Sequence, residues 1–337
     1  MQTTKSQEQI ILWSMLHEPG DALARELFDQ RGTQLIEDFR SGKAQAIWCD
    51  LVPQEYAQEV ADLIERIELR LPKIDVIAAI ERGIRWNFRP LFPTEAPNLF
   101  GKLSDLHPHE PYLLWIAGDH KFLQGTTASV VGTRWPSAKG LANTEKLVAK
   151  LDTPIVSGGA IGIDAAAHRA AIAAGLPTAA VMAGGLDRAY PQVNWELFHQ
   201  IVQSGGAMLS EMPPGTAPTR FRFLQRNRII AALSPATFVV EAGYRSGTLN
   251  TANHAKLLGR DVYAIVGPQD FAPARGCNAM VASGLAMPLQ LDAGERWTDK
   301  RKLQRIEDAR RNGAKTDLDI ARESGLSLRE VRATKAS

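Results

Sequence analysis

Between Ala128 and Val266 the sequence alternates short apolar runs with longer helical stretches, and most apolar runs end in glycine and small polar residues. Continuous apolar strands separated by helices are typical of a parallel sheet covered on both faces. We therefore predict an α/β fold with a Rossmann-like, doubly wound, mainly parallel sheet. The expected strands are 128–131, 154–156, 178–183, 207–209, 237–240 and 262–266, and the expected helices are 137–151, 163–174, 195–203, 219–233 and 248–258.

The loops that follow these strands are the first candidates for a binding site. Right-handed crossovers place the C-terminal ends of parallel strands on one rim of the sheet. Backbone N–H groups at a glycine loop that opens a helix bind anions. Several such loops on one rim suit a phosphate chain better than one small ligand. The candidate loop residues are Gly132, Thr133, Arg134, Ser157, Gly158, Gly159, Gly185, Ser246, Gly247 and Thr248.

Residues 219–230 read TRFRFLQRNRII, in which arginines alternate with phenylalanines. Arginine pairs with phosphate and aromatic rings stack on bases, so we predict that Arg222, Arg226, Asn227 and Arg228 contact DNA. Positions 226 and 228 are about 200° apart on a helix, so one arginine should bind phosphate and the other should be structural. We expect Arg222 to share the face of Arg226, one turn away.

Signs of enzymatic chemistry are weak in the same region. Residues 157–164 read SGGAIGID, which has the wrong spacing for a dinucleotide fingerprint. Asp164 is expected to cap its helix, and His168 to be buried and hydrogen-bonded rather than catalytic. The sequence has no H-E-x-x-H pattern, Walker A lysine or G-x-S-x-G motif, so we expect no catalytic residue, no metal and no cofactor.

Outside this region the sequence predicts three smaller units. The main domain spans residues 111–292. Residues 1–70 carry apolar stripes at helical spacing, and residues 71–110 are proline-rich and suggest an irregular connector with edge strands. Residues 293–337 are charged and carry a helix-turn-helix pattern, with helices at 317–323 and 327–332 and no further element to complete a winged helix.

Composition limits where the chain works and how it binds DNA. The formal net charge is only +2, so affinity for nucleic acid has to come from local clusters. Two cysteines are too few for a disulfide framework, which favours a reduced, cytoplasmic setting. The polar first residues do not look like a signal peptide, and we expect no membrane span.

Taken in order, the motifs resemble the DNA-processing protein A family (DprA, also called Smf). The matching stretches, between about 113 and 289, are SVVGTR, GIDAAAHRAA, GGLDRAYPQVN, SEMPPGTAP, RNRIIAALS, VVEAGYRSGTLNTA and GCN at 276–278. The resemblance implies a homodimer that binds and protects incoming single-stranded DNA and loads the RecA recombinase in natural transformation or recombination, without being an enzyme. It also implies a sterile-alpha-motif-like domain at the N-terminus and a partial winged-helix domain at the C-terminus.

The chain departs from the family pattern at two positions. FRFLQ stands where many members carry Phe-Pro before RNRIIA, and Gln192 stands where many have lysine, which weakens one expected phosphate contact.

Two alternative functions remain open. Nucleotide phosphoribohydrolases of the lysine-decarboxylase-like type have a related fold, but they need a glutamate just after the glycine-threonine of their loop. Here Leu249, Asn250 and Thr251 follow, and only Glu241, before the loop, could replace that carboxylate. The second alternative is a mononucleotide sensor that holds one ligand at the rim.

Overall fold

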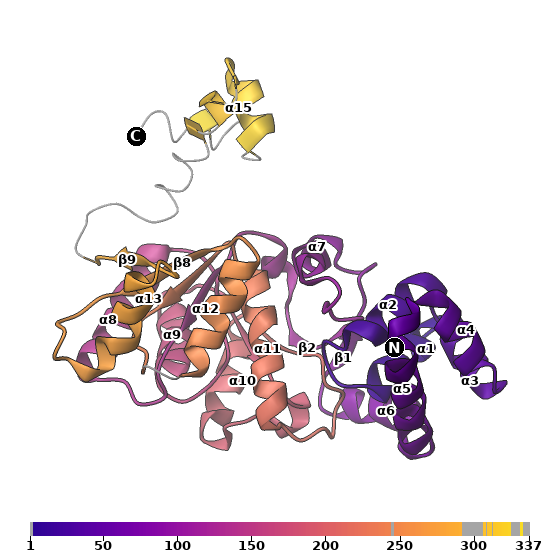
Figure 1. The fold of residues 1–337 in the computed structure, drawn as a ribbon. Coiled ribbons are helices and arrows are strands. Elements are labelled where there is room, and N and C mark those ends of the chain that lie inside the picture. The colour runs from indigo at the N-terminus through magenta and orange to yellow at the C-terminus, as the bar shows by residue number, and fades with distance from the viewer. Residues whose placement is uncertain are drawn as a thin grey trace.

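A nine-stranded sheet forms the centre of the protein, in the order β1-β2-β6-β5-β4-β3-β7-β8-β9 (Figure 1). This computed structural model describes residues 3–243, 246–291, 306–307, 309–311, 313–324 and 331–332. The strands are β1 Arg89–Leu91, β2 Leu114–Gly118, β3 Ala128–Val131, β4 Ile155–Ser157, β5 Thr178–Met182, β6 Ala207–Ser210, β7 Ala236–Val239, β8 Asp261–Ile265 and β9 Met287–Leu289. β2 pairs antiparallel with both of its neighbours, β1 and β6. All other neighbouring strands, along the order β6-β5-β4-β3-β7-β8-β9, pair parallel, so the prediction of a mainly parallel sheet is confirmed.

Helices cover both faces of the sheet, which confirms the doubly wound architecture. On one face lie α7 Pro97–Leu103, α11 Arg220–Leu233, α12 Gly247–Leu257 and α13 Arg275–Ala282, and on the other lie α8 Ala138–Leu151, α9 Ile163–Ala173 and α10 Trp195–Gln203. Successive strand residues point to opposite faces. Val131 of β3 is accordingly buried with residues of α11, whereas Val130 is buried with residues of α8 and α9.

The strand order places β3 at the topological switch point. The chain leaves β3 toward β4, β5 and β6 on one side and returns to β7, β8 and β9 on the other. The loops after β3 and β7 therefore diverge to opposite faces, and open α/β sheets bind ligands in the crevice that this divergence leaves.

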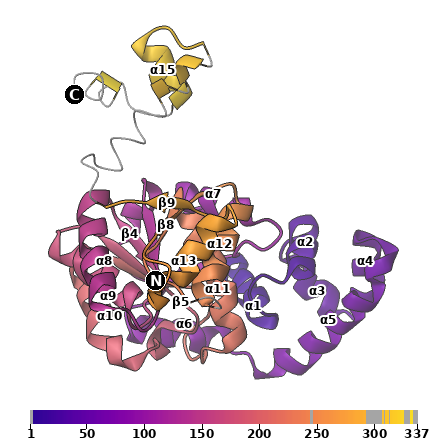
Figure 2. The ribbon, with the colours of Figure 1, turned by 60° about the vertical axis from the view of Figure 1, so that its left-hand side comes forward.

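The N-terminal residues form a helical module beside the sheet, as the apolar stripes predicted (Figure 2). Its helices are α1 Lys5–Leu16, α2 Ala22–Arg31, α3 Gln34–Arg40, α4 Ala44–Leu51 and α5 Ala57–Arg70. Trp13 and Trp48 meet edge to face at 5.7 Å between ring centroids, and both are buried in the core of this module. The module thus has a hydrophobic core of its own.

The expectation of an irregular connector with edge strands over 71–110 is met only in part, because β1 is an edge strand of the sheet but a helix lies on each side of it. Residues Val76–Arg85 form helix α6, which Asp75 caps by accepting a hydrogen bond from the Ala78 N–H at 2.9 Å. Helix α7 follows, with a core of Leu99, Phe100 and Leu103 packed under the sheet. The prolines of this stretch lie beside these elements or at their first turns, where they do not interrupt a helix.

The C-terminal segment is described only in part. Helix α15, Asp317–Ser324, confirms the first of the two expected helices, while residues 325–330, which include most of the expected turn and second helix, lie outside the described residues. The charged run at 300–305 also lies outside them. Within the described part, no helix has the length and apolar character needed to cross a bilayer.

Candidate nucleic-acid interface

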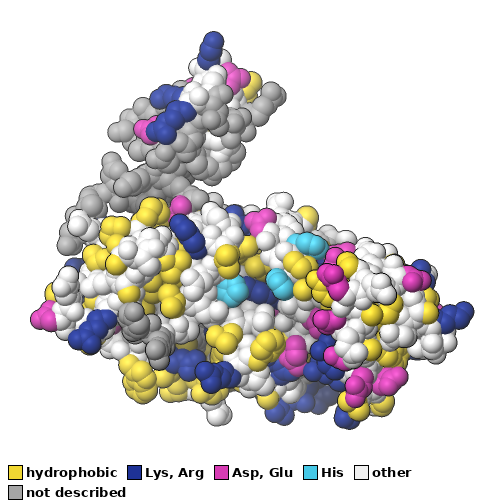
Figure 3. Space-filling view, viewed as in Figure 1, with side chains coloured by type: hydrophobic (Ala, Val, Ile, Leu, Met, Phe, Trp, Pro, Cys, Tyr) yellow, Lys and Arg dark blue, Asp and Glu magenta, His cyan; other side chains and the backbone are white. Residues whose placement is uncertain are grey.

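A cleft of about 650 Å³ opens at the switch point, and we call it the α11 cleft. It is lined by Val131, Gly132, Thr133, Arg134, Trp135, Ala160, Asp164, Tyr190, Pro218, Thr219, Arg220, Phe223, Leu224, Arg226, Asn227, Ile230, Ser246, Gly247, Thr248 and Thr251. Lys and Arg side chains lie beside hydrophobic ones along the lower edge of the face that carries α11 and α12 (Figure 3). The structure thus brings together the predicted residues of three segments: the loop after β3, helix α11 and the start of α12.

The loop after β3 is held from two sides, so that Arg134 projects from a fixed backbone. The Thr133 N–H donates to the Glu241 carbonyl at 2.7 Å, and the Thr133 carbonyl accepts from the Ile163 N–H at 3.1 Å. Gly162, with φ of +89°, lies so close that a Cβ there would come within 2.4 Å of the Thr133 carbonyl oxygen. Only glycine fits this close approach, and the exposed Arg134 side chain is presented to the cleft.

Glu241 has a structural role at the start of α8. Its carboxylate is buried and accepts hydrogen bonds from the Ser137 N–H at 2.9 Å and the Ser137 hydroxyl at 2.5 Å. Ser137 in turn caps α8 by accepting from the Gly140 N–H at 2.9 Å. Glu241 does not line the α11 cleft.

Arg226 lines the cleft but is itself buried, and it ties the loop after β4 to strand β5. Its Nη1 donates to the Gly158 carbonyl at 2.6 Å and also to the Val181 carbonyl. Burial lowers the pKa of Arg226 to about 10, against the opposing effect of Asp164. Burial also raises the pKa of Asp164, and the guanidinium of Arg226 opposes that shift. Arg226 therefore stays charged at neutral pH and shares a largely dry environment with a carboxyl group.

Asp164 does not cap α9 as expected. The N-cap position belongs to Gly162, and the buried Asp164 is the second residue of the helix. Its carboxylate reaches back to the Ala160 N–H at 3.4 Å. The left-handed backbone of Gly162 turns the chain before Asp164, which moves its side chain inward toward Arg226.

Arg228 and Arg222 point away from the α11 cleft. Both Nη atoms of the buried Arg228 donate to the Glu211 carboxylate at 2.7 Å. Arg222 donates to Glu18 of the N-terminal module at 2.9 and 3.0 Å. The expectation that Arg222 shares the face of Arg226 is thus not met, because the long Arg222 side chain reaches the Glu18 carboxylate.

Glu18 is held in its ionised form by two arginines, Arg222 and Arg70. Glu18 also pairs with Arg70 at 3.0 Å. Burial raises the pKa of Glu18, but the two guanidinium groups outweigh it, so the net shift is downward. A carboxylate that stays ionised in a partly buried position needs such partners.

Helix α12 presents its N-terminus to the cleft. Ser246 occupies the N-cap position, and Gly247 and Thr248 begin the helix. The Asn227 side chain donates to the Gly247 carbonyl at 3.3 Å and to the Asn250 side chain at 3.1 Å. Asn227 thus fixes the start of α12, where outward N–H groups and the helix dipole favour an anion.

Other predicted loop residues do not line the cleft. Ser157, Gly158 and Gly159 are buried, and the Ser157 hydroxyl donates to the Val130 carbonyl at 2.6 Å. Gly158 makes room for Arg226, since a Cβ there would come within 2.5 Å of its Nη1. Gly185 is buried, and its N–H donates to the Thr216 carbonyl at 2.8 Å. These loops are closed by contacts within the protein.

Sequence reasoning anticipated aromatic rings between the arginines of 219–230, but it did not assign Trp135 and Tyr190 to the site. Trp135 and Tyr190 are exposed and line the cleft together with Phe223. The Arg134 guanidinium lies 5.6 Å from the centroid of the Phe223 ring, and Tyr190 meets that ring edge-on at 5.7 Å. An aromatic residue directly after a loop arginine was the available signal for Trp135.

His168 is buried and structural, which confirms the prediction. Its Nδ1 lies 2.7 Å from the Thr178 hydroxyl oxygen, and that hydroxyl donates to the Ile155 carbonyl at 2.9 Å. The Thr178 oxygen therefore accepts from the Nδ1–H of the ring. Burial lowers the pKa of His168 to about 3, so the ring is neutral at physiological pH.

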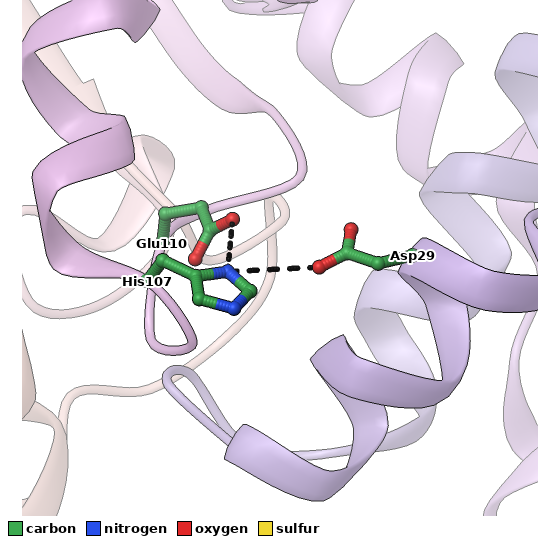
Figure 4. Close-up of side chains that lie close together, drawn as sticks. All are labelled: Asp29, His107 and Glu110. Carbon is green, nitrogen blue, oxygen red and sulfur yellow. Dashed lines mark hydrogen bonds and ion pairs between the residues drawn. The ribbon is translucent and has the colours of Figure 1, made fainter. Parts of the chain in front are cut away.

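One group of side chains far from the cleft has the ligand types of a metal site. Asp29, His107 and Glu110 converge where α2 meets the loop after α7 (Figure 4). The His107 Nδ1 lies 3.2 Å from Glu110 and 3.6 Å from Asp29. Arg25 forms ion pairs with both carboxylates, at 2.7 Å to Asp29 and 3.0 Å to Glu110. The guanidinium already compensates the negative charge, so we interpret the group as an ion-pair network between the module and the main domain.

Comparison with known proteins connects this geometry to one family. A family model described as DNA recombination-mediator protein A matches residues 91–295. A putative DNA processing protein DprA from Mycobacterium tuberculosis is 43% identical over 189 residues, which are 55% of this chain and 48% of that protein. The chain thus spans about half the length of the mycobacterial relative. The DNA processing protein DprA of Streptococcus pneumoniae is 39% identical over 194 residues, or 55% of this chain and 68% of that one.

Two solved structures resemble the protein. The X-ray structure of DNA processing protein A from Streptococcus pneumoniae superposes with a TM-score of 0.64 at 29% identity, over 86% of this chain and 95% of that chain. DNA processing protein A from Helicobacter pylori, which was described for its single-stranded DNA binding mode, gives a TM-score of 0.52 at 29% identity, over 56% and 87% of the chains.

Proposed function

The chain belongs to the DNA recombination-mediator protein A family, and we propose that its α11 cleft binds single-stranded DNA. The resemblance carried by the motifs between about 113 and 289 is confirmed, since the matched range encloses it. Relatives in this family are named for DNA processing, and the Helicobacter pylori structure was described for single-stranded DNA binding.

The observation that supports the proposal is the state of the cleft arginines. Arg134 and Arg220 line the cleft and are exposed, and within the described part of the chain neither forms an ion pair. Cationic side chains that share a concave surface repel one another until an anion binds between them. A DNA backbone supplies phosphates to both arginines and to the N-terminus of α12.

The aromatic lining favours a single strand over a duplex. Phe223 and Tyr190 lie among the cleft arginines. Basic grooves interleaved with aromatic rings hold single strands, because unpaired bases can stack on the rings, whereas duplex bases are stacked on one another. Since every base has a flat aromatic face, we expect little sequence specificity.

The wider role follows from the family resemblance. We propose that the protein protects incoming single-stranded DNA and loads RecA onto it, in natural transformation or another recombination process, and that it works as a homodimer. Light scattering of the purified chain tests the dimer. RecA filament formation on DNA coated with single-stranded DNA-binding protein, with and without this chain, tests the loading.

We expect no nucleotide hydrolysis. Glu241, the carboxylate that could replace the glutamate of the phosphoribohydrolases, caps α8 through Ser137 outside the cleft. Incubation with purine and pyrimidine monophosphates, followed by chromatography for free base, tests this. Release of base that Glu241→Gln abolishes would overturn the expectation.

One titration separates the proposal from its alternatives. Fluorescence anisotropy of a labelled oligo-dT should show binding that is stronger than binding to a duplex of equal length. Affinity should fall steeply with salt, with a log–log slope of about −0.7 per phosphate contact. Mononucleotides should compete poorly. Tight binding of a mononucleotide with weak binding of oligo-dT would instead indicate a sensor, and equal or tighter duplex binding would count against the proposal.

A further inference from the structure

Trp135 stands out among the described tryptophans by its exposure. Its side chain is 82% exposed, whereas Trp13, Trp48 and Trp115 are buried. Trp86, which is 47% exposed, at least meets Trp195 edge-on at 6.2 Å between ring centroids. Trp135 has no such ring contact among the described residues. Leaving a large aromatic ring in water forgoes the stabilisation that its burial would give.

The position of Trp135 is fixed although its ring is free. It follows Arg134 in the loop whose backbone Glu241 and Ile163 hold. The Trp135 N–H donates to the Thr133 hydroxyl oxygen at 3.2 Å, which closes a local turn. The side chain therefore lines the α11 cleft from a rigid base, next to the arginine that we assign to phosphate.

Phe223, the neighbouring ring, is far more enclosed. The guanidinium groups of Arg134 and Arg226 lie 5.6 and 6.0 Å from its centroid, and Tyr190 lies against it edge-on. Phe223 thus helps to hold the arginines in place. The Trp135 indole, by contrast, is 82% exposed and available to a ligand.

From these contacts we infer that Trp135 is a base-stacking platform, so that the cleft reads the presence of bases as well as phosphates. This inference rests on the proposed function and deepens it. The ligand that fits is a single strand whose phosphate pairs with Arg134 and whose adjoining base lies flat on the indole. Base–aromatic stacking of this kind contributes about 5- to 150-fold in affinity per base.

The experiment compares two oligonucleotides that carry the same number of phosphates. One is labelled oligo-dT and the other is an abasic strand of equal length. The wild-type chain should bind oligo-dT more tightly than the abasic strand. Trp135→Ala should weaken oligo-dT binding by about 5- to 150-fold, leave abasic binding unchanged and keep the salt slope. Trp135→Phe should recover part of the difference.

Two matched controls make the result specific. Trp86→Ala removes an exposed tryptophan outside the cleft and should change neither binding curve. Arg134→Ala should weaken both oligonucleotides, because it removes a phosphate contact. Thermal melts of the Trp135 and Arg134 variants should match the wild type, and the binding curves of Trp86→Ala are measured at a temperature where that variant is folded.

The outcomes distinguish this inference from the proposed function. If the wild-type chain binds neither strand, the proposed function fails. If it binds both strands with equal affinity, or if Trp135→Ala leaves oligo-dT binding unchanged, DNA binds but the stacking role is wrong. A Trp135→Ala variant that changes only the oligomeric state would assign the indole to a protein contact and would also overturn the inference.

Discussion

The two sides of helix α11 both carry arginines, but the arginines on one side have carboxylate partners and those on the other side have none among the described residues. Toward the cleft, Arg220 and Arg134 of the loop after β3 have no ion pair within the described chain. Toward the N-terminal module, Arg222 pairs with Glu18 and Arg228 pairs with Glu211. One helix therefore separates compensated from uncompensated positive charge.

The difference shows that the nearest carboxylate, rather than the position of the arginine along the helix, decides whether its guanidinium is available to bind phosphate. A guanidinium that already has a bidentate carboxylate partner gains little from a phosphate, because it must first lose that partner. A guanidinium without one gains a full charge-assisted contact. Glu18 lies 204 residues before Arg222 in the sequence and Glu211 lies 17 residues before Arg228, so neither pairing follows from the spacing within α11, and the fold decides which arginine is free for a ligand.

The largest expected effect comes from the buried pair. Arg228→Ala should lower the free energy of unfolding by about 3–5 kcal/mol, because it leaves the Glu211 carboxylate without its partner. Affinity for oligo-dT should stay within twofold of the wild type at a temperature where the variant is folded. Urea denaturation and anisotropy measure the two quantities. The double variant Glu211→Leu with Arg228→Met should recover much of the stability, and an unstable double variant would contradict the ion-pair explanation.

Substitution of Arg226 should lower both the stability of the protein and its affinity for DNA. Arg226→Ala removes one charged donor, the Nη1 that bonds to the Gly158 and Val181 carbonyls, at a cost of about 1.5–3 kcal/mol in stability. It should also weaken oligo-dT binding, because Gly158, Phe223 and the cleft wall lose their support. The same melt and binding curve check both effects. If Arg226→Ala and Arg228→Ala behave identically in the two assays, the comparison between the two sides of α11 fails.

Arg134 should affect binding alone. Arg134→Ala should reduce affinity for oligo-dT by about 1.5–3 kcal/mol, or roughly 10- to 150-fold, through loss of one charge-assisted phosphate contact. The melting temperature should not change, because the side chain is exposed and has no ion pair in the described chain. The control is Arg169→Ala, an exposed arginine on α9 outside the cleft. Normal affinity in Arg134→Ala would remove this residue from the site.

The smallest effect belongs to the partly exposed pair. Arg222→Ala should cost about 0.2–1 kcal/mol of stability, since its pair with Glu18 is partly open to solvent. Affinity for DNA should not change, because Arg222 does not line the cleft. Calorimetry and anisotropy at low salt give the most sensitive test. A loss of affinity as large as that of Arg134→Ala would show that Arg222 leaves Glu18 to bind DNA.

Elements with strong local signals could be predicted closely. Ser137 and Thr219 stand at helix starts, and each accepts a hydrogen bond from a backbone N–H three residues on. Helix α6 was missed, because the prolines further along the stretch dominated its composition. Asp75 directly before the apolar run at 76–80 carries the same kind of signal. The capping residue marks the start of the helix in all three places, so each start can be predicted from the neighbouring sequence alone.

The composition of the site depended on long-range contacts. The glycines at 158 and 159 have the sequence of an anion loop, but the guanidinium of Arg226 already occupies the space beside Gly158. Whether a glycine serves a ligand or a neighbouring side chain is decided by residues far away in the sequence. The loop after β3 could be assigned to the cleft because it directly follows a central strand.

Both outermost strands of the sheet are three residues long with proline at the centre, Arg89-Pro90-Leu91 in β1 and Met287-Pro288-Leu289 in β9. Proline has no N–H, and strands this short offer few free donors or acceptors along their outer side. Each margin therefore disfavours pairing with a further strand from another molecule. We expect an assembly of two copies of this chain to bury side-chain surface rather than to join the two sheets edge to edge.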